Sequence, residues 1–220
     1  AAVAHRSGAL FHTDAVQGFG RIPLDLSSVD AVSCAAHKIG GPVGVGLLAV
    51  RGRVPLRPRL FGGGQELGRR PGTQDVRAAL AFAAAAKECA SSLEASREVT
   101  ARRARELYAR LCAPGTGIKA TAGVEVGPDR LPGMVSILVP SLDSETLVLA
   151  LDEAGFEVSA GSACSSGSLD PSHVLSAMGI PRQEALGSLR VSFDERVESS
   201  DLESFADALL NIVNSRSSIR

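Results

Sequence analysis

The stretch "DAVSCAAHKIGGPVGVGLLAV", residues 30 to 50, contains two short apolar runs on either side of a glycine-rich loop. Each run has the length of a buried strand, and the Gly-Gly-Pro sequence between them is typical of a loop. Toward the N-terminus, "ALFHTDA" at residues 9 to 15 is another apolar run bounded by turn residues. These runs predict neighbouring strands. Asp14 is then expected at the end of the first strand, and Lys38 at the end of the second.

The rest of the chain alternates between helical and strand patterns. Residues 75 to 112 are rich in Ala, Leu, Glu and Arg, which predicts one long helix or two that stop at Pro114. Alternation of this kind predicts an α/β fold, and a change in composition predicts two lobes, at residues 1–92 and 93–220. Further strands are expected at "GMVSILV", "FEVSA" and "GSLRVSF", and further helices after Asp143, after Asp170-Pro171 and over residues 199 to 215.

Composition narrows the classes of protein. The 220 residues are 45% hydrophobic and carry a formal net charge of -1, which gives no long-range field to attract nucleic acid or an anionic membrane. No apolar run approaches the ~18 residues that would suggest a membrane span. The four cysteines, at 34, 89, 112 and 164, are widely separated, which argues against a disulfide framework or a zinc site. We therefore expect a protein of the reducing cytoplasm that binds neither nucleic acid nor membrane.

Asp14 and Lys38 are the first candidate functional residues. The ends of neighbouring strands in a layered α/β sheet form the edge where ligands bind. Gln17 follows Asp14 by three residues and could reach the same place, and Gly40 and Gly41 would let a bulky group approach the backbone. A solvated surface ion pair between Asp14 and Lys38 is the alternative.

Several motifs then occur together in one order. "HTDAVQ", "AHKIGGPVGVGLL", "FGGGQELGRRPGT" and "AGSACSSGSLDPSHVLSAMG" fall between residues 12 and 179, and "SLRVSF" follows them. This combination resembles cysteine desulfurases of the NifS/IscS type, which are pyridoxal phosphate enzymes of the class V aminotransferase group. The resemblance implies a fold-type I transferase, represented here by the end of its large cofactor-binding domain and a small C-terminal α/β domain.

The resemblance also implies roles for residues of the first lobe. Lys38 would bind the cofactor aldehyde, since a neutral amine is the nucleophile that such a bond requires. Asp14 would keep the pyridine nitrogen protonated, so that the ring can withdraw electrons. His37 could instead be a core histidine tied to backbone, and Thr73 could instead cap the long helix. The implied cofactor contacts are Asp14, Gln17, His37, Lys38 and Thr73, with Thr73 reaching across a dimer.

Two positions depart from the family pattern. Ala35 stands where the family often has a serine that contributes to the phosphate site. Strand alternation places Ser33, rather than Cys34, on the same face as Ala35. Gln65 stands where the family usually has a histidine, so the role of that side chain does not carry over.

Cys164 and Arg190 are the candidates in the second lobe. Cys164 lies among Ser, Gly and Ala in "GSACSSGS", a composition that leaves a thiol accessible and a loop movable. The resemblance makes it the nucleophile that takes sulfur from the substrate; the alternative is an incidental thiol. Arg190, on an otherwise apolar strand, resembles the arginine that binds the substrate carboxylate, with a structural ion pair as the alternative.

The resemblance predicts a cysteine desulfurase that converts L-cysteine to L-alanine and carries the sulfur as a persulfide. It would be a homodimer with pyridoxal 5'-phosphate as cofactor, and would pass sulfur to a scaffold or carrier protein for iron–sulfur cluster or thio-cofactor synthesis. We expect the chain to be the C-terminal portion of such an enzyme, with little activity alone. A selenocysteine lyase, another class V aminotransferase, and a truncated, non-catalytic copy that binds a partner are the alternatives.

Overall fold

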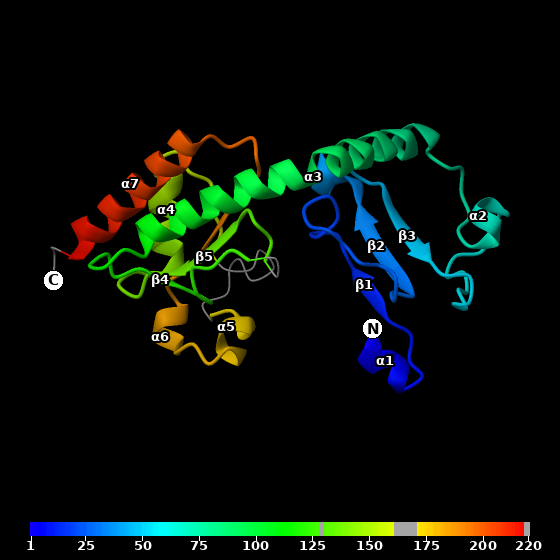
Figure 1. Cartoon of the computed structure of the whole chain (residues 1–220), viewed down its shortest axis with the longest axis horizontal. Helices are drawn as coiled ribbons and strands as arrows, with labels where there is room; N and C mark the ends of the chain where they lie inside the picture. Colours follow the sequence, from blue (N-terminus) through cyan, green and yellow to red (C-terminus); the bar gives the residue numbers. More distant parts are fainter. Residues whose placement is uncertain (128–129, 161–170, 218–220) are drawn as a thin grey trace. The chain divides into compact units, whose positions relative to one another are not determined.

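A computed structural model describes residues 1–127, 130–160 and 171–217. The chain divides into two compact units, Ala1–Glu94 and Ala95–Arg220, which are described separately below. Helix α3 (Val76–Leu111) is a single helix of 36 residues that belongs to both units (Figure 1). The prediction of a long helix is thus confirmed as one helix, while the functional assignment of domains 1–92 and 93–220 stays a prediction.

The first unit is built on a three-stranded sheet in the order β1-β2-β3. Strands β1 and β2 are parallel, and β3 is antiparallel to β2. All three strands lie inside the apolar runs that predicted them, and each is shorter than its run. The elements of the unit are α1 (Ala2–Arg6), β1 (His12–Asp14), β2 (Ala31–Ala35), the 3-10 helix η1 (Ala36–Ile39), β3 (Gly46–Val50), α2 (Gln65–Gly68) and the first part of α3.

Alternation along β2 gives the sheet a buried face and a more open face. Val32 and Cys34 are buried, and they pack in one apolar cluster with Phe82 of α3. Phe19, from the turn after β1, meets the Phe82 ring edge-on, with 6.3 Å between the ring centroids. The opposite face carries Ser33 of β2, together with its register partners Asp14 of β1 and Leu48 of β3.

A buried carboxylate joins the start of this sheet to α1. Asp30 is 1% exposed and accepts hydrogen bonds from Phe11 N at 2.8 Å and from His5 Nε2 at 2.7 Å. Arg53, in the segment after β3, forms an ion pair with its other oxygen. The Phe11 N–H, the His5 bond and the Arg53 charge together lower the pKa of Asp30 to about 2. The carboxylate therefore links four segments of the first unit.

This lowered pKa predicts a loss of stability in acid. A carboxyl whose folded pKa lies below its unfolded value stabilises the fold above the unfolded pKa, near ~4, and loses that contribution as protons bind. The Asp30 contribution should therefore be intact at neutral pH and fall as the pH drops from ~4 toward the folded pKa of about 2. Acid titration followed by circular dichroism should show a flatter pH dependence for Asp30→Asn in this window. Parallel curves for the two proteins would contradict the assignment.

The second unit contains an antiparallel three-stranded sheet in the order β4-β5-β6. The expected strands at "GMVSILV" and "GSLRVSF" are confirmed as β5 and β6. The elements of the unit are the second part of α3, β4 (Lys119–Ala120), β5 (Met134–Leu138), α4 (Ser144–Glu153), α5 (His173–Ala177), α6 (Arg182–Ala185), β6 (Ser188–Ser192) and α7 (Ser199–Ser217).

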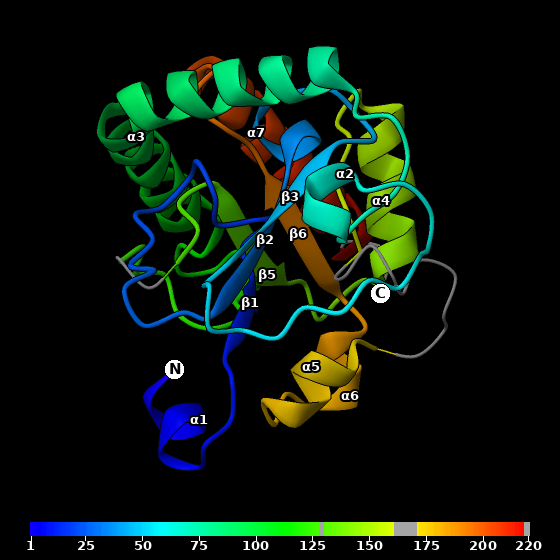
Figure 2. The same ribbon diagram turned by 90° about the vertical axis from the view of Figure 1, so that its right-hand side faces the viewer.

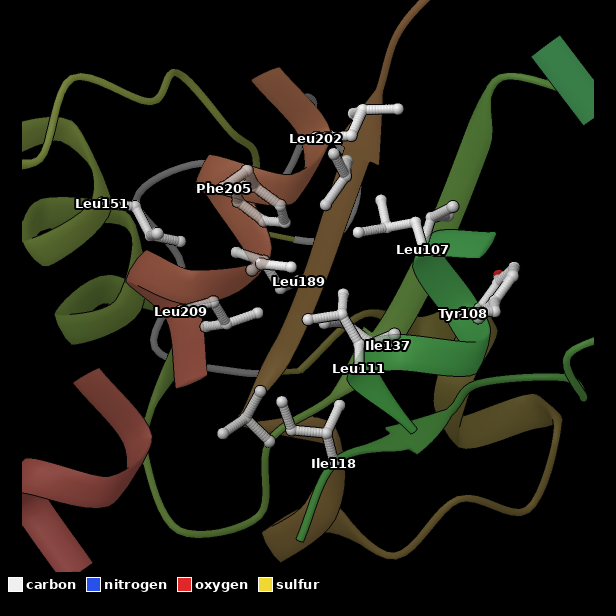
Figure 3. Close-up of a cluster of buried hydrophobic side chains, with 14 of the residues drawn as sticks. Leu107, Tyr108, Leu111, Ile118, Ile137, Leu151, Leu189, Leu202, Phe205 and Leu209 are labelled. Atoms are coloured by element: carbon white, nitrogen blue, oxygen red, sulfur yellow. The ribbon is translucent and has the colours of Figure 1, made fainter. Parts of the chain in front are cut away.

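The main core of this unit lies between the sheet and three helices. Figure 3 shows Leu107 and Leu111 of α3 with Phe205 and Leu209 of α7 around Leu189 of β6. Leu147 and Leu151 of α4 belong to the same cluster and are fully buried. On the other side, Leu138 packs with Leu175 of α5 and Ala185 of α6, two short helices that lie side by side (Figure 2). The core-facing residues of β5 and β6 alternate with residues of the opposite face, among them Ser136 and Arg190.

The residues at the N-termini of three helices can be compared with the N-caps expected from the sequence. Asp143 caps α4 as expected, since its Oδ1 accepts from Thr146 N at 2.8 Å and this bond lowers the pKa of the carboxyl. The cap expected at Asp170-Pro171 is wrong: Ser172 caps α5, its hydroxyl accepting from Val174 N at 3.3 Å. The N-cap role considered for Thr73 is also wrong, because Asp75 Oδ1 accepts from Ala78 N at 3.0 Å. In both cases the N-cap is a side chain two residues further along the chain, whose oxygen accepts the hydrogen bond from the helix backbone.

The strand expected at "FEVSA" is wrong as well. Only Ser159 pairs with a neighbour, through an isolated bridge to Arg190 of β6. The segment therefore pairs with the sheet at one residue and does not add a strand to it.

Within residues 1–127, 130–160 and 171–217, no helix has both the length and the apolarity needed to cross a bilayer. The same residues hold no group of three or more His, Cys, Asp or Glu side chains arranged to bind a metal ion.

Candidate functional site

The parallel pairing of β1 and β2 brings the two predicted residues of the first unit to one edge of the sheet. Asp14 is the last residue of β1, and its register partner is Ser33 of β2. Lys38 lies in η1, which begins directly after β2 ends. The carboxyl ends of parallel strands meet at the same edge, so the carboxylate and the amine are placed on neighbouring segments there. The sequence prediction of this arrangement is confirmed, while the roles of the residues stay predictions.

Glycines allow the chain to turn sharply after Lys38. Gly40 ends η1 in the left-handed conformation, with φ of 80°, which a residue with a Cβ adopts at a cost. A Cβ on Gly41 would lie 2.9 Å from the Cβ of Ala36. The loop therefore folds tightly back on the start of η1, with His37 exposed and Lys38 partly buried.

Asp14 begins a compact turn that also contains Gln17. The Asp14 Oδ1 accepts a hydrogen bond from Val16 N at 2.9 Å, and Phe19 N donates to the Ala15 carbonyl at 2.8 Å. Gln17 is exposed on this turn, which places it at the same sheet edge as Asp14. The turn thus holds the Asp14 carboxylate at the end of the strand through backbone contacts.

The β2 residues next to Asp14 show which side chains share the face of Ala35. Ser33 and Ala35 alternate with the buried Cys34, which confirms that Ser33 shares the face of Ala35. The Ser33 hydroxyl, however, is hydrogen-bonded to His12 Nε2 at 3.0 Å. Burial, and then the negative charge of Asp14, raises the pKa of the Cys34 thiol, so Cys34 behaves as a buried neutral side chain.

Gln65 has a clear structural contact. Its Oε1 accepts a hydrogen bond from Gly72 N at 3.3 Å, and this bond closes the segment that leads to Thr73. Inside the closed segment, Glu66 and Leu67 have φ of 50° and 60°, in the left-handed region that costs a non-glycine residue about 1 kcal/mol or more. Thr73 itself is exposed at the end of the segment.

Arg190 lies on β6 in the second unit, on the face away from the main core. Both of its backbone groups pair with Ser159: Arg190 N donates to Ser159 O at 2.8 Å, and Ser159 N donates to Arg190 O at 3.2 Å. Its Nε is buried and has no hydrogen-bond partner among the described residues. A buried N–H of a permanently charged group is costly without an acceptor, so the side chain is suited to bind an anion.

Cys164 lies outside the described residues, in the stretch 161–170. Cys34, Cys89 and Cys112 carry thiols rather than disulfides. Burial raises the pKa of the Cys112 thiol, and Cys89 Sγ donates to the Ile39 carbonyl at 3.7 Å. Their packing agrees with the interpretation of these three cysteines as small apolar side chains.

Two contacts at the first-unit edge were not foreseen from the sequence. Alternation indicates the His12–Ser33 pair: His12 and Asp14 are two residues apart on β1 and so share a face, and Ser33 is the register partner of Asp14. The hydrogen bond from Arg21 to the Lys38 carbonyl joins residues 17 positions apart, and no local pattern indicates it.

The sequence of the chain matches a known protein family. The chain matches the family described as aminotransferase class-V over residues 1–205. It is 40% identical over 216 residues to a cysteine desulfurase of Gluconacetobacter diazotrophicus, covering 97% of this chain and 53% of that protein. It is 39% identical over 207 residues to the cysteine desulfurase NifS of Azotobacter vinelandii, covering 92% of this chain and 50% of that protein.

A solved structure agrees with these relatives. The NifS-like protein from Rickettsia africae superimposes with a TM-score of 0.84 at 28% identity, covering 97% of this chain and 56% of that one. The chain spans about half the length of the relatives that it matches. Because the family match covers nearly all of its residues, the chain belongs to the class V aminotransferase family.

Proposed function

We propose that this chain contributes the lysine-bearing edge and the sulfur-accepting cysteine of a pyridoxal phosphate-dependent cysteine desulfurase. The observation that carries the proposal is the placement of Asp14 and Lys38 on neighbouring segments, at the carboxyl ends of two parallel strands. The relatives named cysteine desulfurase, which match over 97% of the chain, support this choice of activity within the family.

The groups at this edge fit the cofactor. Pyridoxal phosphate needs a primary amine for its aldehyde, an anion for its pyridine nitrogen and donors for its phosphate. Lys38 supplies the amine and Asp14 the anion, while Gln17 would donate to the ring oxygen, and His37 and Thr73 to the phosphate. Folding of the Gly40–Gly41 loop against Ala36 keeps the backbone beside Lys38 free of side-chain bulk. Ser33 lies on the same face of β2 as Ala35, and its hydroxyl is hydrogen-bonded to His12 Nε2.

When bound, pyridoxal phosphate supplies an electron-withdrawing ring that stabilises negative charge on the α-carbon of an amino acid. The Asp14 carboxylate would hold the ring nitrogen in its protonated form and so maintain that capacity. With the cofactor and substrate bound, Lys38 Nζ would accept the α-proton of the substrate. Arg190 would bind the substrate carboxylate, which gives its buried Nε the acceptor that the described residues do not supply.

Sulfur transfer requires a second nucleophile, and we assign it to Cys164. Its thiolate attacks the sulfur of L-cysteine, so that a sulfur–sulfur bond forms while the substrate carbon–sulfur bond breaks. The electron pair of the broken bond stays on the substrate β-carbon, which takes up a proton. The products are L-alanine and a persulfide on Cys164, and no outside oxidant or reductant is needed.

The most direct test uses a chimera in which this chain replaces the matching 216 residues of the Gluconacetobacter relative. Incubation with L-cysteine should give equal amounts of alanine and persulfide. Cys164→Ala should reduce sulfide release in the presence of a thiol reductant by at least ~100-fold, because the sulfur then lacks its acceptor. Cys112→Ala, which removes a half-buried thiol, is the matched control and should keep the activity.

The same variants separate the alternatives. Transamination that survives in Cys164→Ala, without desulfuration in the parent, would show a class V aminotransferase. Faster turnover of selenocysteine than of cysteine would show a selenocysteine lyase. If the chimera binds neither cofactor nor substrate, the chain is a non-catalytic copy.

The assembly and setting follow from the same proposal. A homodimer would allow Thr73 to reach the partner's phosphate site, and a scaffold or carrier protein would receive the persulfide sulfur. The thiols at Cys34, Cys89 and Cys112 suit the reducing cytoplasm.

A further inference from the structure

Arg21 reaches from the turn after β1 to the peptide that follows Lys38. Its Nη2 donates a hydrogen bond to the Lys38 carbonyl oxygen at 3.1 Å. In a continuing 3-10 helix this carbonyl would accept from Gly41 N. Gly41 N instead donates to the Ala36 carbonyl at 2.9 Å, because the chain turns back after η1. The guanidinium therefore bonds a carbonyl that the helix does not bond itself.

The turn that carries Arg21 is in close contact with η1. Gly20 has φ of 74°, and a Cβ there would lie 2.9 Å from Ile39 Cγ2 and 3.1 Å from Cys89 Cβ. The Cys89 thiol of α3 also donates to the Ile39 carbonyl at 3.7 Å. Contacts from the turn and from α3 thus meet on the two residues Lys38 and Ile39.

The same turn begins at Asp14. Hydrogen bonds fix its two ends: Val16 N donates to the Asp14 side-chain oxygen Oδ1 at 2.9 Å, and Arg21 N donates to the Gly18 carbonyl at 3.1 Å. Asp14 stands at the start of the turn and Arg21 at its end. The turn is therefore a short, bonded connection between the carboxylate at the edge and the backbone of Lys38.

We infer that Arg21 is a positioning residue for Lys38. By holding the Lys38 carbonyl, it fixes the orientation of η1 relative to Asp14, and hence the direction in which the ε-amine leaves the backbone. The inference rests on the proposed function, since an amine of fixed direction matters when it must meet an aldehyde on a ring bound by Asp14. A misplacement of about 1 Å at a reacting group can cost a hundredfold in rate.

The first measurement needs no cofactor. Amide hydrogen exchange at Gly41 reports opening of η1, because this N–H bonds the Ala36 carbonyl. In the chain itself, Arg21→Ala should accelerate exchange at Gly41 by about fivefold to tenfold, the value of one charge-assisted hydrogen bond at an exposed position. Arg21→Lys keeps a donor and should recover much of the protection. Unchanged exchange in Arg21→Ala would overturn the inference.

The second measurement reports the amine. Pyridoxal phosphate is added to the chimera, the imine is trapped with borohydride, and labelled lysines are found by mass spectrometry. The other lysines of this chain, Lys87 and Lys119, are internal references. Arg21→Ala should lower the initial labelling rate of Lys38 relative to Lys87 by about tenfold, with recovery in Arg21→Lys. Lys87 lies on α3 in the same unit, so the ratio corrects for partial unfolding.

Arg51→Ala is the matched control. The Arg51 guanidinium also binds a backbone carbonyl, with Nε donating to Val29 O at 2.7 Å, but at the opposite end of β2 from Lys38. It should lower stability and leave the labelling ratio unchanged; an equal fall in the ratio would overturn the inference. Equal ratios in the parent and Arg21→Ala would overturn it while the proposed function survives. Absence of preferred Lys38 labelling in the parent would instead contradict the proposed function.

Discussion

Lys38→Ala in the chimera is expected to remove the visible absorbance of lysine-bound pyridoxal phosphate and to lower alanine formation by a thousandfold or more. The side chain is proposed both to hold the cofactor aldehyde and to move the α-proton, and loss of a residue with two such roles typically costs this order of magnitude. Lys38→Arg should fail to the same extent, because a guanidinium stays protonated and cannot attack an aldehyde. The spectrum and the product are measured on the same samples.

Lys87→Ala is the control for this result. Lys87 lies on α3, five residues after the buried Phe82, which packs in the apolar cluster of the first unit, and the Lys87 side chain is exposed. The spectrum and rate of Lys87→Ala should match those of the parent. If Lys38→Ala kept the absorbance while Lys87→Ala lost it, the cofactor lysine would have been misassigned.

The placement of Asp14 and Lys38 could be predicted because it depends on local patterns. Apolar runs of strand length, each followed by turn residues, set the ends of β1 and β2. Parallel pairing then brought those ends to one edge. Alternation along β2 likewise predicted correctly that Ser33, and not Cys34, shares the face of Ala35. These inferences need no knowledge of distant contacts.

The predictions that failed concern competition between nearby side chains. Asp75 lies two residues after Thr73, and Ser172 lies two residues after Asp170; either member of each pair has the chemistry of a cap. The choice depends on where the backbone enters the helix, which tertiary packing decides. The segment "FEVSA" has strand composition, yet only Ser159 finds a neighbour on β6.

Other contacts could not be predicted because they join distant segments. Asp30 bonds His5 and Arg53, which lie 25 and 23 residues away, and Arg21 bonds Lys38 across 17 residues. Nothing in the spacing of these residues marks them as partners. Strand pairing sets the position of the sheet edge, and side-chain hydrogen bonds of this kind fix the orientation of the residues on it. Variants of these side chains should therefore distinguish a positioning role from a catalytic one.

Gly187→Ala is expected to destabilise the second unit by at least ~3 kcal/mol, at the upper end of the cost of overpacking. A Cβ at this position would lie 2.1 Å from the Val139 carbonyl oxygen and 2.6 Å from the Leu142 carbonyl oxygen. Both obstacles are backbone atoms, so no side-chain rotation relieves the clash. Val139 N also donates to the Gly187 carbonyl at 2.8 Å, and separating the two segments would break this bond.

Urea unfolding of the chain should show the effect as a midpoint lowered by about 1–2 M, given the slope usual for small domains. Gly127→Ala is the matched control, because a Cβ there meets no atom within 4 Å, and it should leave the midpoint unchanged. Gly187 lies between the end of α6 and the start of β6, the strand that carries Arg190. If Gly187→Ala unfolded at the same urea concentration as the parent, the close approach of residues 139 and 187 would be wrong.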